Sequence, residues 1–403
     1  MPHQQRWWVL GVLSLIFFFL NGATFASLGV VLFSMVADLH WSQTEAGASF
    51  SLLGIACGVA SPLPALLMRR FRCRWVVVLG GLCLAAGFWL AWAARGLPLF
   101  FVAMILLGMG YALAGNIPGV YLIASWFPRT SARMIGLYLM IGAAGNVVGP
   151  PLVAGIVAAS GSWRFNWLLM GVLALACALL CLLLIRDAPE APAPGDAAAP
   201  TVIAGGIWRD REAMLTRQFA LVAAAMTLTV AGITTNSSVA VAHLVRSGST
   251  PAFAAFVLSL VALVATLFKG VAGRLSESIR ANRILAGGLV LQAIGDIAFS
   301  PGGSLLGDYL FALAFGIGWG LSYVAANIVL LEYFGRAVGA RILSAVWMIS
   351  TLAAAGPVAA GFIADRVGSF SPIFSIYAAL LLLLALPIFA MRAPSRGTCE
   401  VPV

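Results

Sequence analysis

Long runs of apolar residues constrain the fold of this chain more than any other feature. Such runs occupy residues 7–35, 75–94, 163–185 and 370–391. An α-helix rises about 1.5 Å per residue, so each run can cross a hydrocarbon core of about 30 Å. The apolar residues are continuous and do not alternate with polar ones, and a bilayer cannot satisfy exposed peptide groups. Helices are therefore required and a β-barrel is excluded. The sequence predicts an all-α membrane protein.

We expect twelve membrane-spanning helices. The composition agrees, because 62% of the residues are hydrophobic and 9% are charged, against roughly a quarter charged in a soluble domain. The expected spans are residues 7–35, 44–68, 75–94, 98–126, 132–159, 163–185, 219–246, 251–273, 281–299, 303–332, 337–364 and 370–391.

The arginines indicate how the chain is oriented in the membrane. Twelve spans place both termini on one side, and the termini and loops of that side hold all the arginines except Arg95, Arg164, Arg246 and Arg366. Basic residues accumulate in cytoplasmic loops, so we expect both termini to be cytoplasmic in a bacterial inner membrane. The net charge of +10 then reports this topology, and we expect no nucleic-acid partner. The apolar run after Arg6 is too long for a signal-peptide core and is expected to remain as the first span.

The spans divide into two groups of six. Residues 186–218 form one long polar stretch rich in Pro and Ala, which predicts a linker between an N-terminal bundle at 1–185 and a C-terminal bundle at 219–403 with a short cytoplasmic tail. Short segments recur in both halves at offsets of about 206, such as WFPRTSAR (126–133) and YFGRAVGAR (333–341). A duplicated six-helix unit in one orientation is the arrangement of large secondary transporters, whose substrate site lies between the repeats.

Several loop motifs carry a family resemblance. The loop ALLMRRFRCR (65–74) contains Arg70 and Arg74, and its counterpart GRLSESIRANR (273–283) contains Gly273 and Glu277. With FASLGVVLFSMVADLHWS (25–42) and WFPRTSARMIGLYLMIGAAGNVVGPP (126–151), these segments resemble the major facilitator superfamily over the whole chain. Within it, the chain is similar to bacterial relatives of monocarboxylate transporters and oxalate/formate exchangers. The resemblance implies two halves around a central cavity that rock to open it to each side in turn, with the four loop residues in gating.

Lys269, the only lysine, lies in the eighth span, where the resembled carriers place a cation. An ionisable group in a membrane span usually marks a substrate path. Of the thirteen acids, only Asp296 is expected well inside a span, so an incoming carboxylate would be the partner for this ammonium. Alternatively, the lysine snorkels to the membrane surface, since Arg274 follows five residues later. We predict a small organic anion as substrate, a monocarboxylate above all.

Six further polar or aromatic residues lie in spans that line the cavity in this superfamily. Each has an ordinary alternative, since a buried Asn can bond a neighbouring helix and a Tyr or Trp can simply pack. The substrate-site candidates beside Lys269 are Asn116, Tyr121, Asn236, Tyr323, Asn327 and Trp347.

The coupling mechanism is left open by the sequence. The resembled carriers have an aspartate one turn before the eighth-span cation and a lysine in the first span, and this chain has Ala265 and Ala26 there. Asp296, His243 and Glu332 are the substitute proton carriers we consider. Proton symport, exchange against a counter-anion and uniport all remain possible interpretations.

Other classes of function compete with anion transport. Residues 136–155 partly match a fifth-span pattern associated with antiporters, at Gly136, Gly145, Gly149 and Pro150, which makes drug or metabolite efflux the alternative transporter, although glycines also serve close helix packing. A transporter-like receptor would keep the site and lose the rocking. The three dispersed histidines and the unpaired cysteines offer no catalytic or metal-binding motif. We expect no enzyme activity, no cofactor, no metal, and a monomer.

Overall fold

The computed structural model describes residues 2–68, 70–127, 130–185, 210–334, 342 and 345–394. Most of the expected linker, at 186–209, lies outside these residues, as does 335–341 of the repeated loop. Within the described residues the chain is helical and contains no strand. The all-α prediction is confirmed.

The N-terminal half supplies six spans, three of which are interrupted. The first consists of α1 (Pro2–Ala23) and α2 (Phe25–Leu39), the second of α3 (Gln43–Ala60) and α4 (Leu63–Met68), and the fourth of α6 (Leu97–Ala114) and α7 (Asn116–Trp126). The third, fifth and sixth are α5 (Cys73–Ala93), α8 (Ser131–Ser160) and α9 (Trp163–Leu184).

The C-terminal half begins with the short α10 (Asp210–Met214). Its first four spans are α11 (Arg217–Arg246), α12 (Pro251–Leu275), α13 (Ala281–Phe299) and α14 (Leu305–Phe334). The next contains the 3₁₀ turn η1 (Ser350–Ala354) and α16 (Ala355–Val367), and the last is α17 (Ser371–Phe389). Thr216 and Thr250 cap α11 and α12 by accepting from the backbone N–H groups of Phe219 and Phe253, which fixes where these helices begin.

Eleven helical segments of the described chain are long and apolar enough to cross a membrane. The remaining expected span is α13, a helix of 19 residues that is less apolar because it carries Asn282, Arg283, Gln292 and Asp296. It packs against α14 and α17 inside the C-terminal half. The structure is thus compatible with twelve spans.

Close helix crossings rest on glycine. Gly145 and Gly149 of α8 face Gly22 of α1, and a Cβ on Gly145 would fall 2.1 Å from the carbonyl oxygen of Phe18. On the other side of the molecule, a Cβ on Gly320 of α14 would fall 2.5 Å from the carbonyl oxygen of Ala265 on α12. Small residues let membrane helices approach closely, so Gly145 and Gly149 of the antiporter-like pattern have a packing role here, whereas a Cβ on Gly136 would meet nothing within 4 Å.

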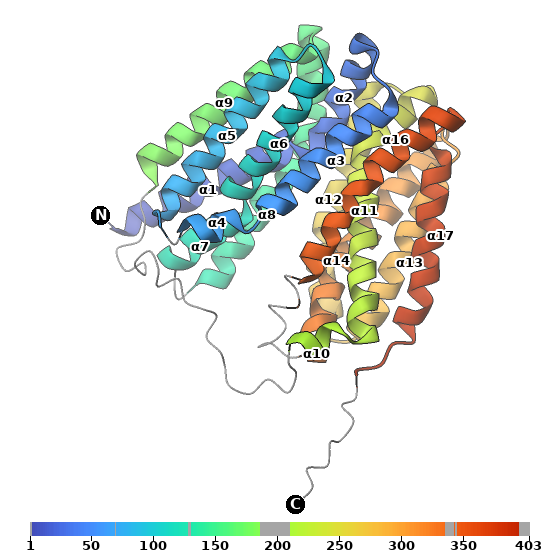
Figure 1. Cartoon of the computed structure of the whole chain (residues 1–403). Coiled ribbons are helices and arrows are strands. Elements are labelled where there is room, and N and C mark those ends of the chain that lie inside the picture. Colours follow the sequence, from blue (N-terminus) through green and yellow to red (C-terminus); the bar gives the residue numbers. More distant parts are fainter. Residues whose placement is uncertain are drawn as a thin grey trace, which may run out of the picture.

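The two halves touch mainly through α3 with α16, α8 with α12, and α2 with α11. We call the end at which α1 begins and α17 ends the near end, and the opposite end the far end. Figure 1 shows the halves meeting at the far end, where α3 and α16 lie side by side, and standing apart at the near end.

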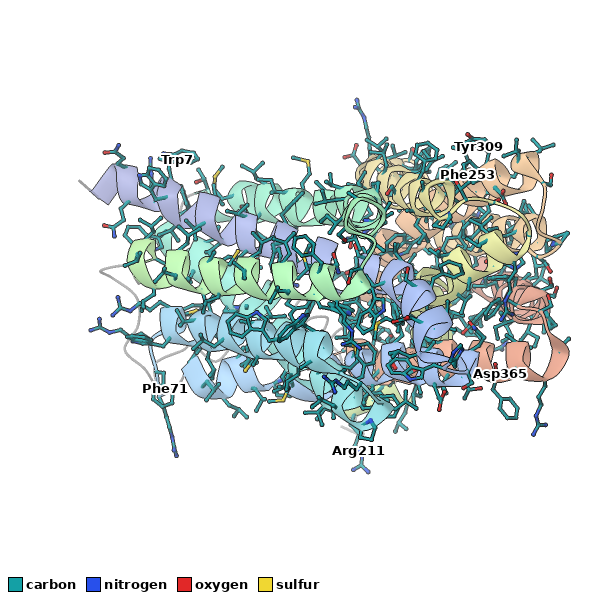
Figure 2. The ribbon with its side chains drawn as sticks, turned by 90° about the horizontal axis from the view of Figure 1, so that it is seen from above. Trp7, Phe71, Arg211, Phe253, Tyr309 and Asp365 are labelled. Carbon is teal, nitrogen blue, oxygen red and sulfur yellow. The ribbon has the colours of Figure 1, made fainter. Side chains whose placement is uncertain are left out.

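A polar contact joins the halves at the far end. The Asp365 carboxylate at the end of α16 accepts hydrogen bonds from the backbone N–H groups of Gln43 (2.9 Å) and Thr44 (2.8 Å) and from the Thr44 hydroxyl (2.5 Å). Figure 2 looks onto this end of the molecule and labels Asp365. The carboxylate therefore caps the first turn of α3, where backbone N–H groups lack helix partners.

Candidate functional site

The side chain of Lys269 is held by aromatic rings of a neighbouring helix. Its Nζ lies 4.6 Å from the ring centroid of Trp319 and 4.8 Å from that of Tyr323, both on α14. Both distances fall within the range of cation–π attraction. A third ring continues the group, because Trp347 lies 5.6 Å from Tyr323 between ring centroids. We call Lys269, Trp319, Tyr323 and Trp347 the lysine–aromatic cluster.

The ammonium points toward the middle of the membrane. Residues 305–334 form α14, so Trp319 has about 21 Å of helix on one side and about 22 Å on the other, at about 1.5 Å per residue. A lysine that snorkelled would extend toward the near end, where Arg274 lies exposed. Instead its Nζ lies within cation–π distance of Trp319, at the middle of α14, and of Tyr323 one turn further along. This geometry disfavours the snorkelling interpretation.

No acid among the described residues neutralises Lys269. Its ammonium contacts the two rings, and its burial removes it from water. Cation–π attraction is worth about 0.5–2 kcal/mol, which is less than the cost of removing an ammonium from water. The cation is therefore incompletely compensated, which favours binding of an anion.

The N-terminal half contributes uncharged polar groups at two helix interruptions. The first span breaks at Thr24 and the fourth at Gly115, and the Tyr111 hydroxyl joins them by donating to Asn21 Oδ1 over 2.9 Å. Discontinuous helices of this kind occur at many transporter sites, where their breaks expose backbone polar groups.

The remaining substrate-site candidates have varied positions. Asn116 is exposed at the start of α7, beside the interruption, and Tyr121 is half-buried one turn further. The Asn327 amide donates to the carbonyl oxygen of Tyr323 on its own helix at 2.5 Å. Asn236 is fully buried and bonds Asp296, so the structure does not bring it to Lys269. Substrate contact by these residues stays a prediction.

The three coupling candidates lie apart from one another. Asp296 is fully buried on α13. His243 is buried on α11, seven residues beyond Asn236 toward the far end, with Nε2 3.0 Å from the carbonyl oxygen of Phe299 and its ring packed against Phe299 and Phe374. Glu332 is exposed near the end of α14. Only Asp296 and His243 are therefore shielded in the way that a proton carrier inside a membrane requires.

The loop residues predicted for gating lie at the near end. Arg70, Gly273 and Glu277 are exposed. Arg74 is half-buried, and its guanidinium lies 5.0 Å from the ring centroid of Trp75. Nothing in their geometry distinguishes gating from a solvated loop, so the gating role stays a prediction.

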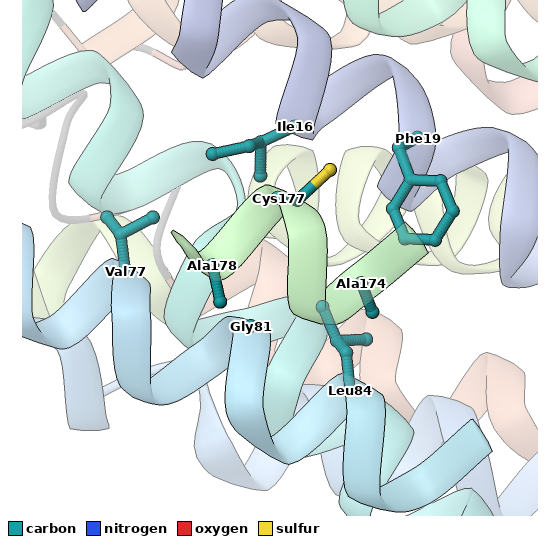
Figure 3. Close-up of a pocket in the computed structure, with 8 residues that line it drawn as sticks. All are labelled: Ile16, Phe19, Val77, Gly81, Leu84, Ala174, Cys177 and Ala178. Carbon is teal, nitrogen blue, oxygen red and sulfur yellow. The ribbon is translucent and has the colours of Figure 1, made fainter. Parts of the chain in front are cut away.

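A small pocket elsewhere in the molecule is not part of this site. It lies between α1, α5 and α9 in the N-terminal half (Figure 3). Its lining is apolar and includes Phe19, Leu84 and Cys177, so it offers no hydrogen bond to a polar substrate. The described residues also contain no group of three potential metal ligands.

Three residues of the site escaped the sequence analysis. Trp319 lies in the stretch GIGWG (316–320) of an apolar span, and its position on the face of α14 that meets Lys269 depends on how two helices cross. Asn21 and Tyr111 pair across 90 residues of sequence. The sequence did contain a sign of this pair. The stretches NGAT (21–24) and AGNIPG (114–119) place Gly or Pro inside apolar spans, and such interrupted spans are typical of transporter sites.

Comparison with known proteins agrees with this architecture. A protein of Rattus norvegicus described as monocarboxylate transporter 3 is 28% identical over 331 residues, which cover 78% of this chain and 65% of that protein. The uncharacterized transporter YycB of Bacillus subtilis (strain 168) is 27% identical over 401 residues, covering 95% and 94%. The crystal structure of the nucleoside transporter NupG superposes with a TM-score of 0.76 at 16% identity, covering 96% of this chain and 98% of that one.

The family model described as Major Facilitator Superfamily matches residues 14–355. The match includes the interruptions at Thr24 and Gly115 and the lysine–aromatic cluster. The fold and the relatives are those of multi-pass membrane transporters and not of enzymes. From its sequence and its fold together, the chain belongs to the major facilitator superfamily.

Proposed function

We propose that this protein is a secondary transporter that moves a small organic anion, a monocarboxylate above all, across a bacterial inner membrane by alternating access. The observation that carries the proposal is the ammonium of Lys269, held toward the membrane centre by Trp319 and Tyr323 without an acid partner among the described residues. A carboxylate entering this cluster would supply the missing charge through a charge-assisted hydrogen bond.

The surroundings of the ammonium favour a substrate with an apolar body. Trp319 and Tyr323 present rings beside the cation, Trp347 packs against Tyr323, and aromatic faces pack well against apolar atoms. Binding sites for small molecules are mostly apolar, with a few polar groups that fix orientation. Lys269 would fix the carboxylate, and Asn21 and Tyr111 offer hydrogen bonds from the other half. The name of the rat relative, a monocarboxylate transporter, supports the same substrate class.

Alternating access is supported by the distribution of contacts between the halves. The Asp365 carboxylate joins them at the far end, and the near ends stand apart (Figure 1). Movement of one half against the other would exchange these states around a site at the midplane. If the termini are cytoplasmic, as the arginine distribution predicts, this arrangement faces the cytoplasm.

The experiment has two steps. A thermal-shift screen of the purified protein against lactate, pyruvate, benzoate, oxalate, amino acids, sugars and cationic drugs identifies the best anion. Calorimetry then measures its affinity for the parent, for Lys269→Gln and for Lys269→Arg. A charge-assisted hydrogen bond contributes about 1.5–3 kcal/mol, so Lys269→Gln should weaken binding by about 10- to 150-fold. Lys269→Arg should keep part of the affinity and change selectivity, because a planar fork replaces a point charge.

Arg274→Gln is the matched control. It removes a basic residue five positions further along α12, where the side chain is exposed, and should leave the affinity unchanged. An unaltered affinity in Lys269→Gln would overturn the proposal. Uptake into proteoliposomes separates a transporter from a receptor, because a receptor binds the anion without moving it. A screen in which only cationic drugs stabilise the protein would favour efflux instead.

A further inference from the structure

A second polar centre lies inside the C-terminal half, away from Lys269. Asp296 of α13 is fully buried and so is Asn236 of α11. The Asn236 amide nitrogen Nδ2 donates to Asp296 Oδ1 over 3.2 Å. We call these two side chains the acid–amide pair.

The acid–amide pair contains two buried oxygen atoms without a partner, Asp296 Oδ2 and Asn236 Oδ1. Both are acceptors when the carboxyl is ionised, so neither can satisfy the other. A proton on Oδ2 would turn that atom into a donor, and the amide oxygen of the same pair is the available acceptor. One proton would thus remove both deficits. If the oxygen and nitrogen of the Asn236 amide exchanged places, the amide oxygen would face Asp296 Oδ1, and a proton would still be needed between the two oxygens.

No cation among the described residues compensates the carboxyl from the surrounding helices. The influences on Asp296 are burial and the Asn236 amide. Toward it α14 presents Phe315, which packs on Gly295, and α17 presents Tyr377, whose hydroxyl lies 3.0 Å from that of Thr235 on α11. His243 is the nearest base along α11, and it faces the carbonyl oxygen of Phe299. Arg246 and Asp308 lie beyond it, at the far ends of α11 and α14. An isolated buried carboxylate is costly, and such groups normally become neutral.

We propose that Asp296 and Asn236 form a proton-binding site that couples proton movement to anion transport. The proposal rests on the proposed function. In the loaded state the proton is bound to Asp296 Oδ2 and donated to Asn236 Oδ1. Release breaks only this O–H bond and its hydrogen bond, and leaves the carboxylate with the amide N–H. Moving one proton with one monocarboxylate carries no net charge.

Polar groups of α11, α13 and α14 lie between the acid–amide pair and the lysine–aromatic cluster in the sequence of their helices. Gln292 lies one turn before Asp296 on α13, and its Nε2 donates to Ser322 Oγ at 3.0 Å and to Thr229 Oγ1 at 3.3 Å. Ser322 precedes Tyr323, whose ring contacts Lys269. A change in the packing of α11, α13 and α14 would therefore be felt at both centres.

Infrared spectroscopy tests the proton without any substrate. The parent should show at neutral pH the C=O stretch of a protonated, buried carboxylic acid. Asp296→Asn, which keeps the size of the side chain, should lack this band. Asn236→Ala should shift it, because the carbonyl loses its amide donor. Asp308→Asn is the control, since that aspartate is also buried but lies in the first turn of α14, where the helix dipole favours the ionised form.

Proteoliposomes test coupling with radiolabelled lactate, pyruvate, benzoate and oxalate as probes. In the parent, an inward proton gradient of one pH unit should support about tenfold accumulation of a monocarboxylate at one proton per anion, with proton entry reported by a trapped dye. Asp296→Asn should lose accumulation and proton entry but retain exchange of labelled for unlabelled anion. Asp308→Asn should behave as the parent.

The outcomes separate the two proposals. If the parent binds and exchanges an anion but the carboxylic acid band is missing, the acid–amide pair is ionised and this inference fails while the proposed function stands. The same holds if Asp296→Asn still accumulates anion on a proton gradient. If the parent neither binds nor moves any of the anions, the proposed function itself fails and coupling falls with it.

Discussion

The two halves of the molecule repeat one architecture but bury different chemistry. In the described part of the N-terminal half, the buried polar residues are uncharged: Ser14, Thr24, Ser27, Ser49, Ser51 and Asn166. In the described part of the C-terminal half, the buried polar residues include the ionisable His243, Asp296 and Asp308, and the half-buried Lys269 lies in the same half. Each half supplies six spans, but the buried acids and the buried histidine lie in one of the two halves.

The halves also differ in how their helices are interrupted. The N-terminal half breaks its first span at Thr24 and its fourth at Gly115, and Tyr138 steadies the second break by donating to the Gly115 carbonyl over 3.1 Å. In the C-terminal half, the equivalent spans α11 and α14 are continuous helices of 30 residues each. Broken helices expose backbone polar groups, whereas continuous ones project side chains. The difference indicates that one half contributes shape and neutral hydrogen bonds and the other contributes charge.

The largest effect within this comparison should come from Trp319 of the C-terminal half. Trp319→Leu removes one of the two rings beside Lys269 Nζ and should weaken anion binding by up to about tenfold, because the ammonium is no longer held in a fixed position for the ligand. Tyr323→Phe keeps the second ring and removes only a hydroxyl, so its effect should stay below about twofold. Calorimetry with the best screened anion measures both.

Trp319→Leu and Tyr323→Phe together show whether an aromatic ring or a hydroxyl group matters for anion binding. A large loss in Tyr323→Phe together with a small one in Trp319→Leu would mean that a phenol hydroxyl, and not the aromatic faces, holds the ligand. The C-terminal half would then act through neutral hydrogen bonds as the N-terminal half does, and the proposed division of roles would be wrong.

A smaller effect is expected at the contact between the halves. Asp365→Asn leaves the side chain volume but removes the charge that caps α3, so the far ends should separate in a larger fraction of molecules. Spin labels on cysteines placed at the exposed positions His40 and Val367 would report the distance distribution by pulsed electron resonance, in a background without the native cysteines.

Asp38 provides the control for this contact. It is also an exposed aspartate at the far end, but it accepts from Trp163 Nε1 within the N-terminal half at 2.9 Å. Asp38→Asn should leave the distance distribution unchanged. Equal distributions in Asp365→Asn and the parent would show that apolar packing alone, such as that of Gly47 on Pro357, closes the far end.

The fold was largely predictable because its main determinant is local. The length and continuity of an apolar run specify a span without reference to any other part of the chain. Helix α13 shows where this signal weakens, because a few polar residues lower its hydropathy below that of the other spans. Interruptions were harder to predict. Thr24 and Gly115 stand inside apolar runs, and whether such residues break a helix depends on tertiary partners such as Tyr111 and Tyr138.

The candidate site was predictable only in part, because a side chain's partners come from other helices. Lys269 was found through its uniqueness and depth, which are properties of the sequence. Its ring partner Trp319 lies 50 positions away, and the crossing at Gly320 decides that they meet. Asn236 was assigned to the substrate cavity from its span, but rotation of α11 in the bundle turns it to Asp296. The spacing of residues in the sequence shows which face of a helix a side chain lies on, but it does not show which other helix that face contacts.

The smallest effect should come from the neutral pair of the N-terminal half. Tyr111→Phe removes the hydrogen bond to Asn21 at 2.9 Å. Hydrogen bonds between membrane helices average about 0.6 kcal/mol, so the equilibrium constant of unfolding in mixed micelles should change about threefold, and anion affinity by a similar factor if the interrupted spans face the ligand. In a cycle with Asn21→Ala, the double variant should lose little more than either single variant, because the two side chains share one bond.

Tyr309→Phe is the matched control, since its ring contacts Phe253 at the surface of the C-terminal half, at 6.1 Å between centroids (Figure 2). Removing that exposed hydroxyl should alter neither stability nor affinity. Additive losses for Tyr111→Phe and Asn21→Ala would show that the two residues act independently. If Tyr111→Phe lost as much affinity as Lys269→Gln, the decisive contact with the ligand would lie in the N-terminal half. A neutral hydrogen bond between two side chains is too weak for such a loss, so Tyr111 would have to bind the ligand itself.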